Sequence, residues 1–173
     1  MKDKYFQVCP SVNRMDLTIW DADHNLITEL RYDYGTSIGI VNLDEQEYSF
    51  QKKSRTITNL LCNQSVSSEI HFVFDYPWER FAHFRMNNET FILKYTFSGA
   101  GIRLVKANSS LVLMMKWKLY AEGKDNWFIR FFFRKRYYLV QIVDKTMDRS
   151  QILPLVLICA YCMQVFLHVY SDE

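Results

Sequence analysis

Two cysteines in the C-terminal part of the chain have a spacing that can do chemistry. Cys159 and Cys162 are separated by two residues, as in redox-active dithiols and in one half of many zinc sites. No second pair lies near them, and the residues around them are apolar. We therefore expect two buried structural cysteines.

A second group of chemically capable residues lies in and beyond a predicted strand. Three of its members, Glu69, His71 and Asp75, share one strand face, and the whole group could assemble a metal site or an acid–base pair. Its spacing is not that of H-E-x-x-H or another metal signature, which favours a solvated strand face. The group consists of Glu69, His71, Asp75, Glu79 and His83.

Enzyme motifs give no support to catalysis. The sequence contains neither the P-loop motif G-x-x-x-x-G-K-[ST] nor the dinucleotide motif G-x-G-x-x-G, and we expect no G-x-S-x-G nucleophile either. The prediction is a protein that is not an enzyme, with no catalytic residue, no metal and no cofactor.

Basic residues interleaved with aromatic residues form the main candidate binding feature. They punctuate the segments Trp127–Phe133 and Tyr137–Tyr138, and two lysines lie on the expected neighbouring strand. Arginine contacts phosphate in bidentate fashion and aromatic rings enter a membrane interface, so the pattern suits phosphate or phospholipid headgroups. The simpler alternative is a hairpin at the edge of a sheet, where the charged residues only keep the edge soluble. The candidate residues are Lys116, Lys118, Arg130, Arg134, Lys135 and Arg136.

The composition is that of one folded domain. The chain has 173 residues, of which 49% are hydrophobic and 16% aromatic, and its net charge is +2. A chain of this length buries enough surface to need neither disulfides nor a metal, which predicts a single domain over residues 1–173. Disordered and collagen-like classes are excluded, and a pI near 8.3 gives little support to nucleic-acid binding.

The cysteine content and the N-terminus bear on location. Four cysteines are too few and too unevenly spaced for a secreted disulfide framework, and no apolar segment follows the charged N-terminal residues as in a signal peptide. We expect reduced thiols and a cytoplasmic protein, with peripheral attachment to a membrane as an open alternative.

The small net charge conceals two oppositely charged blocks. Residues 16–50 hold eight acidic residues against the single base Arg31, whereas residues 101–149 hold eleven bases against four acids. The two blocks pairing within one fold is the favoured interpretation, and a basic face that binds a partner is the alternative.

Most of the chain has the period of two that is typical of strands. Residues 91–97 and 69–75 alternate apolar and polar side chains, and Trp127, Ile129, Phe131 and Phe133 form a third apolar row. Short polar turns separate these segments, so consecutive strands should pair as antiparallel hairpins. With only five glycines, Asn and Asp must supply many turn conformations. We predict ten to twelve strands over residues 4–144.

The C-terminal segment differs from the rest. Residues 152–170 are almost wholly apolar without a period of two, which predicts a helix over about residues 150–170, capped by Asp148 or Ser150, with Pro154 near its first turn. Such a helix is long enough to cross a bilayer or to fill a domain. The many strands, each with one apolar face, would enclose a space that must be filled, so we favour a buried helix over a tail anchor.

This order of elements resembles the tubby C-terminal-like superfamily, which includes the LURP-one-related proteins and the phospholipid scramblases. The segment Leu17–Ile27 resembles the family's repeat of strand, acidic turn and strand, and Tyr138–Ile142 followed by Leu153–Leu157 resembles its last strand and central helix. The chain departs from the family in having His24-Asn25 where glycine is common, in Pro154, and in lacking an acidic calcium loop before the helix.

The resemblance implies a mainly β fold, a closed antiparallel barrel wrapped around one hydrophobic C-terminal helix. Tubby-branch members bind phosphoinositides, so it also implies a non-catalytic barrel that binds an anionic phospholipid headgroup or a protein partner. A tail-anchored protein spanning the bilayer with residues 152–170 and a small-ligand barrel using His71 and its neighbours are the alternatives. Nucleic acid is not an expected partner, and the oligomeric state is left open.

Overall fold

The computed structural model describes residues 5–10, 15–75, 79–96, 101–119 and 136–168. Over these residues the chain forms twelve strands and one long helix. The elements are β1 (Tyr5–Pro10), β2 (Leu17–Trp20), β3 (Leu26–Asp33), β4 (Ile38–Leu43), β5 (Gln46–Lys52), β6 (Ile57–Cys62), β7 (Ser65–Asp75), β8 (Glu79–Met86), β9 (Glu89–Thr96), β10 (Gly101–Lys106), β11 (Leu111–Leu119), β12 (Arg136–Ile142) and α2 (Arg149–His168).

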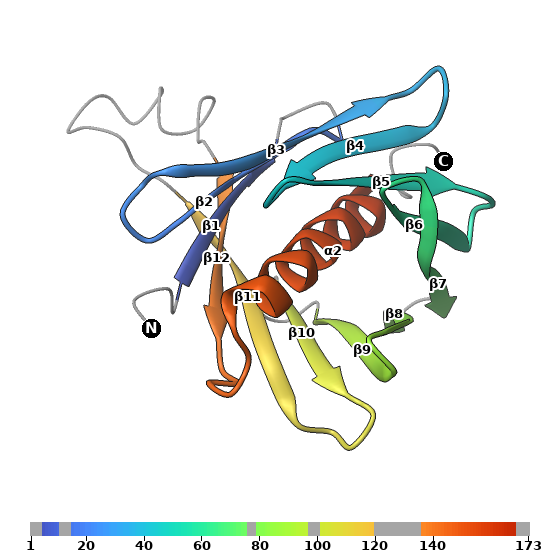
Figure 1. Cartoon of the computed structure of the whole chain (residues 1–173). Helices are drawn as coiled ribbons and strands as arrows, with labels where there is room; N and C mark the ends of the chain where they lie inside the picture. The colour runs from blue at the N-terminus through green and yellow to red at the C-terminus, as the bar shows by residue number, and fades with distance from the viewer. Residues whose placement is uncertain (1–4, 11–14, 76–78, 97–100, 120–135, 169–173) are drawn as a thin grey trace, which may run out of the picture.

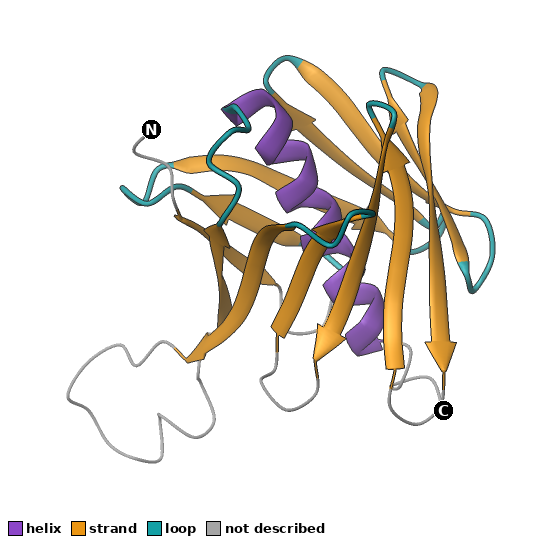
Figure 2. Ribbon diagram, turned by 90° about the horizontal axis from the view of Figure 1, so that it is seen from below, coloured by secondary structure: helices purple, strands orange, loops and turns teal. Residues whose placement is uncertain are grey.

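The strands form a closed barrel. Each pairs antiparallel with the next along the chain, and β12 pairs with β1 to close the ring. The strands surround α2 (Figure 1), and the view from below shows the helix running along the inside of the wall (Figure 2). The predicted fold, a closed antiparallel barrel around one hydrophobic C-terminal helix, is confirmed. The predicted apolar row from Trp127 to Phe133 lies outside the described residues.

Tight turns between the strands use residues other than glycine. Three two-residue turns have both residues at positive φ, which is the geometry of a type I′ hairpin and matches the twist of the flanking strands. Asparagine and aspartate tolerate this conformation best, and they provide most of these positions. The turns are Asp44-Glu45, Asn63-Gln64 and Asn87-Asn88.

The helix begins with a capping box. The Gln151 amide donates to Asp148 Oδ1 at 3.0 Å, and the Asp148 amide donates to Gln151 Oε1 at 3.2 Å. The predicted cap by Asp148 is confirmed. Pro154 is the sixth residue of α2, just past the first turn, and its missing N–H cannot donate to the carbonyl of the exposed Ser150.

The middle of α2 is buried on all sides. Every residue from Leu155 to Met163 is at most 1% exposed. Tyr161 stacks on Phe50 of β5, with ring centroids 4.2 Å apart, and Phe166 lies edge-on to Phe72 of β7. The helix is therefore the core of the barrel, as expected for a helix that is hydrophobic all round.

One stretch within the described residues, Arg149–Phe166, is long and apolar enough to cross a bilayer, and 78% of it is buried inside the barrel. A helix that fills a core passes the same test of length and composition as one that spans a membrane. Its enclosure by twelve strands is therefore the observation that distinguishes the two arrangements.

Candidate anion-binding face

The structure describes part of the predicted basic cluster. Lys116 and Lys118 belong to β11, and Arg136 is the first residue of β12. The register aligns Lys116 with Leu139 and Lys118 with Tyr137, so β11 is indeed the neighbour of the strand that starts at Arg136. Arg130, Arg134 and Lys135 lie outside the described residues.

Two further cations join Lys116 on the outside of the barrel. Lys94 of β9 lies directly opposite Arg103 of β10, and Lys116 of β11 lies opposite Gly101, two residues from Arg103. All three side chains are exposed, while Leu93, Ile102 and Met115, which precede them in their strands, are buried in the core. We call Lys94, Arg103 and Lys116 the basic face.

Apolar side chains flank the basic face. Phe81 lies opposite Lys94 on β8, Met114 opposite Arg103, and Leu139 opposite Lys116. All three apolar residues are half-buried on the outer surface. The face thus combines cations with apolar surface, a combination that suits the boundary between headgroups and acyl chains.

Within the described part of the chain, no ion pair or side-chain hydrogen bond neutralises the basic face. Lys106 on the same strand as Arg103 shows the contrast, because its Nζ lies 3.3 Å from Glu89 Oε2 and 3.4 Å from Asp144 Oδ2. These two carboxylates raise the pKa of Lys106, with the hydrogen bond to Glu89 as the largest cause.

Within the described residues, the expected pairing of the two charged blocks does not involve the basic face. The acidic strands β2–β5 and the basic strands β10–β12 are not neighbours, because β1 separates them on one side and β6–β9 on the other. Arg149, just before the helix core, does attract the exposed Asp21 and contributes to lowering its pKa, after hydrogen bonds from Asn25 as the largest cause. Arg103 and Lys116 have no such acidic partner among the described residues.

The edge-hairpin alternative does not fit Lys116 and Lys118. Charged residues protect a strand edge when its backbone groups are unpaired. β11 pairs with β10 on one side and β12 on the other, and β12 pairs with β1. These strands therefore need no charge to block edge-to-edge association.

The histidine group lies on the outer surface of β7 and β8. His71 and His83 are directly opposite, with parallel rings whose centroids are 5.1 Å apart, and His71 Nε2 lies 3.5 Å from Glu69 Oε2. Burial, and to a lesser degree His71, lowers the pKa of His83. Asp75 and Glu79 are paired in register, and their side chains are outside the described set. No three metal-binding side chains come together within the residues that the structure describes.

Cys159 and Cys162 are fully buried in α2, as predicted. Burial raises the pKa of both thiols well above its usual value, so neither forms a thiolate near neutral pH. The pair therefore contributes packing in the core.

The expectation that no G-x-S-x-G spacing occurs is wrong. Residues 35–39 read Gly-Thr-Ser-Ile-Gly, and Ser37 has a φ of 57°. A hydrolase nucleophile sits between a strand and a helix, whereas Ser37 lies in the hairpin between β3 and β4. Its hydroxyl interacts with the Tyr32 side chain, and none of the described contacts joins it to a histidine. The motif therefore lacks the strand-to-helix turn that exposes a hydrolase nucleophile.

Comparison of the chain with protein-family models, with curated proteins and with solved structures finds no match in any of the three. The class of the protein rests on its geometry. It is a closed twelve-stranded antiparallel barrel, over the described residues, with a buried C-terminal helix and an unneutralised basic face across β9–β11.

Proposed function

We propose that this chain is a non-catalytic barrel of the tubby C-terminal-like type that binds anionic phospholipid headgroups through the basic face. The observation that carries the proposal is the direct opposition of Lys94 and Arg103, with Lys116 on the next strand. Like charges directly opposite each other destabilise a sheet, and no carboxylate of the described residues neutralises them, so an anion bound between these side chains would offset the repulsion.

The barrel architecture supports a binding role for the outer wall. A small-ligand barrel would hold its ligand in the centre, but side chains of α2 that are at most 1% exposed occupy that space. Enclosure of the same helix also favours the barrel over a tail-anchored protein. The outer surface is where a ligand can reach this molecule without displacing its core.

The magnitude of the effect is sufficient for reversible binding to a membrane. Each lysine or arginine near an anionic surface contributes about 1 kcal/mol, so three contribute about a hundredfold in affinity. The flanking Phe81 and Met114 add apolar contact at the interface. Peripheral binding of this strength is sensitive to salt, because the attraction is screened over about 10 Å at 0.1 M.

Vesicle co-sedimentation tests the proposal. Wild type should sediment with phosphatidylcholine vesicles that contain about a fifth phosphatidylserine, and not with pure phosphatidylcholine. The triple variant Lys94→Gln, Arg103→Gln, Lys116→Gln should bind about a hundredfold more weakly. A matched control, Arg31→Gln, Lys52→Gln, Lys145→Gln, changes the net charge equally at three exposed sites on other elements and should bind like wild type.

Three outcomes would overturn the lipid proposal. Wild type could fail to sediment with anionic vesicles. The two triple variants could also lose binding equally, in which case net charge alone acts. Finally, the basic-face variant could bind vesicles normally, which would leave the face to a protein partner.

A further inference from the structure

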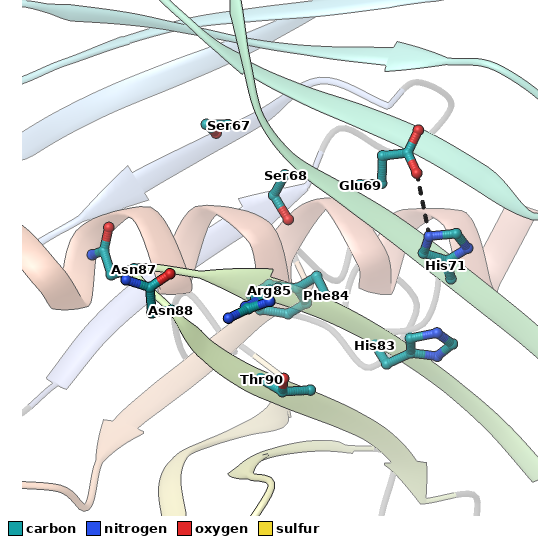
Figure 3. A pocket seen from close by; sticks show the side chains of 10 residues that line it. All are labelled: Ser67, Ser68, Glu69, His71, His83, Phe84, Arg85, Asn87, Asn88 and Thr90. Atoms are coloured by element: carbon teal, nitrogen blue, oxygen red, sulfur yellow. Dashed lines mark ion pairs between the residues drawn. The ribbon is translucent and has the colours of Figure 1, made fainter.

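A separate feature of the wall lies where β7 and β8 part. Their ladder runs from Asp75 opposite Glu79 to His71 opposite His83 and stops there. Beyond that point the two strands do not pair with each other. The unpaired stretches are Ser65–Ile70 of β7 and Phe84–Met86 of β8. We call this opening the β7–β8 wedge (Figure 3).

A β-bulge accounts for the wedge. The register of β6 with β7 shifts between Leu60 and Leu61, so that Ser68 lies opposite Leu60 while Val66 lies opposite Leu61, leaving Ser67 as the extra residue. A bulge bends and twists its strand. The first half of β7 therefore follows β6 and leaves β8.

Backbone groups of both strands face the wedge. The Phe72 amide donates to the Thr56 carbonyl at 2.8 Å on the β6 side, so the alternation of an antiparallel ladder turns His71 and Glu69 toward β8. Met86 of β8 and Glu89 of β9 close the two-residue turn, which turns the backbone groups of Arg85 away from β9. Glu69 and Arg85 thus point their N–H and C=O groups into the opening.

Charge repulsion does not explain why the β7–β8 ladder stops at His71 and His83. If the register continued, Glu69 would lie opposite Arg85, which is a favourable pair. Instead, Glu69 Oε1 lies 3.2 Å from Lys53 Nζ, and its other oxygen contacts His71. Arg85 is exposed and has no ion pair among the described residues.

A buried hydroxyl provides an independent sign of a ligand. Ser68 is only 6% exposed, and its Oγ has no hydrogen-bond partner among the described residues. The close view shows this side chain directed into the gap between the two strands (Figure 3). An unsatisfied buried hydroxyl costs about 1–3 kcal/mol, and Ser68 is among the residues that line the wedge.

We propose that the β7–β8 wedge binds an extended peptide segment of a partner protein by β-strand addition. An added strand supplies alternating N–H and C=O groups, which is what the facing backbone of Glu69 and Arg85 requires. The cavity has a volume of about 700 Å³, and the unpaired part of β7, at roughly 3.3 Å per residue, has the length of an ordinary strand. Because Glu69 is already paired, Arg85 selects a peptide with a carboxylate beside it. This inference does not depend on lipid binding by the basic face.

Proline substitutions test the backbone contacts specifically. Proline removes a donor and is tolerated where the N–H faces away from the ladder. Glu69→Pro and Arg85→Pro therefore each remove a donor in the wedge and leave the β6–β7 and β8–β9 ladders intact. Arg85→Gln is the matched control, because it keeps the amide and removes only the charge.

The probe is a random dodecapeptide phage library panned on the full chain, followed by synthesis of the enriched peptides. We expect binding that weakens about tenfold in each proline variant and less in Arg85→Gln. N-methylation of alternate peptide amides should weaken binding to wild type by a similar factor. This test removes the same backbone hydrogen bonds without changing the protein, so it does not depend on whether the proline variants fold. In peptide-free protein, the Glu69 and Arg85 amides should exchange hydrogen rapidly, and a bound peptide should protect them.

The proposal is overturned if panning enriches no peptide beyond those captured by the double proline variant. It is also overturned if enriched peptides bind the proline variants and wild type equally, or if their N-methylated forms retain full affinity. Vesicle binding should be unchanged in Glu69→Pro, so failure here and failure of the lipid proposal are separate results.

Discussion

Arg80 of β8 reaches into the barrel and donates a 2.7 Å hydrogen bond from Nη1 to the main-chain carbonyl of Phe166 near the end of α2. The side chain is 9% exposed, and its guanidinium carbon lies 5.7 Å from the centre of the Tyr95 ring. The cation donates to a carbonyl in the last turn of the described helix and complements the negative end of the helix dipole. The hydrogen bond therefore joins β8 of the barrel to α2 at its centre.

Replacing Arg80 with Met should destabilise the barrel by about 2–4 kcal/mol, because the Phe166 carbonyl would lose the buried, charged donor Arg80. Urea unfolding followed by circular dichroism gives the difference. Arg85→Met changes an exposed arginine on the same strand and should cost less than about 0.5 kcal/mol. Equal midpoints for the two variants would show that the hydrogen bond to the helix end contributes nothing.

Leu157 tests the enclosure of the helix. It is 0% exposed at the centre of α2, so Leu157→Asp places a carboxylate among apolar side chains, at a cost of several kcal/mol that is comparable with the stability of a whole domain. We expect loss of soluble folded protein. Leu157→Met conserves volume and should cost less than about 1.5 kcal/mol. An Asp variant with an unchanged melting temperature would contradict the buried position.

The cap of α2 predicts a dependence of stability on pH. Hydrogen bonds, first from the Ser150 hydroxyl and then from the Gln151 amide, lower the pKa of Asp148. A lowered pKa in the folded state means that the stabilisation is present above the unfolded pKa of about 3.9 and is lost as the pH falls through the folded value.

The variant Asp148→Asn keeps a side-chain oxygen for the cap and removes the titration. Wild type should lose more stability than this variant as the pH falls below about 4. Urea midpoints measured across that range make the comparison, and the other acidic residues contribute equally to both proteins. Parallel pH profiles would mean that the capping carboxylate is not stabilised in the folded state.

The barrel and its helix were predictable because both follow from local patterns. Alternation in segments such as residues 69–75 identifies a strand with one buried face, and an apolar segment without that period identifies the helix. Since a closed sheet of this size must be filled, the two observations together determine the architecture. Even the cap at Asp148 is a local signal, given Gln151 three residues later.

The basic face was not predictable because it depends on register. Lys94 is recognisable in the sequence only as the polar position of a strand, and its place opposite Arg103 follows from how β9 and β10 align. The same holds for the β7–β8 wedge, which arises from one extra residue at Ser67. Nothing in the local sequence marks Ser67 as a bulge, since bulges are selected by the pairing of two strands.

The remaining prediction concerns Arg134, Lys135 and Arg136, the cluster that the sequence singled out. Arg136 begins β12 beside Leu119 of β11, and the other two lie outside the described residues. If these cations also meet an anionic membrane, changing all three to Gln should weaken binding to phosphatidylserine vesicles by about a hundredfold. The difference should shrink at higher salt, because charges beyond about 10 Å are already screened at 0.1 M. Comparison with the triple variant of the basic face then separates the two clusters. If the Arg134–Arg136 variant binds like wild type at low salt while the basic-face variant does not, the lipid contact lies on β9–β11 alone.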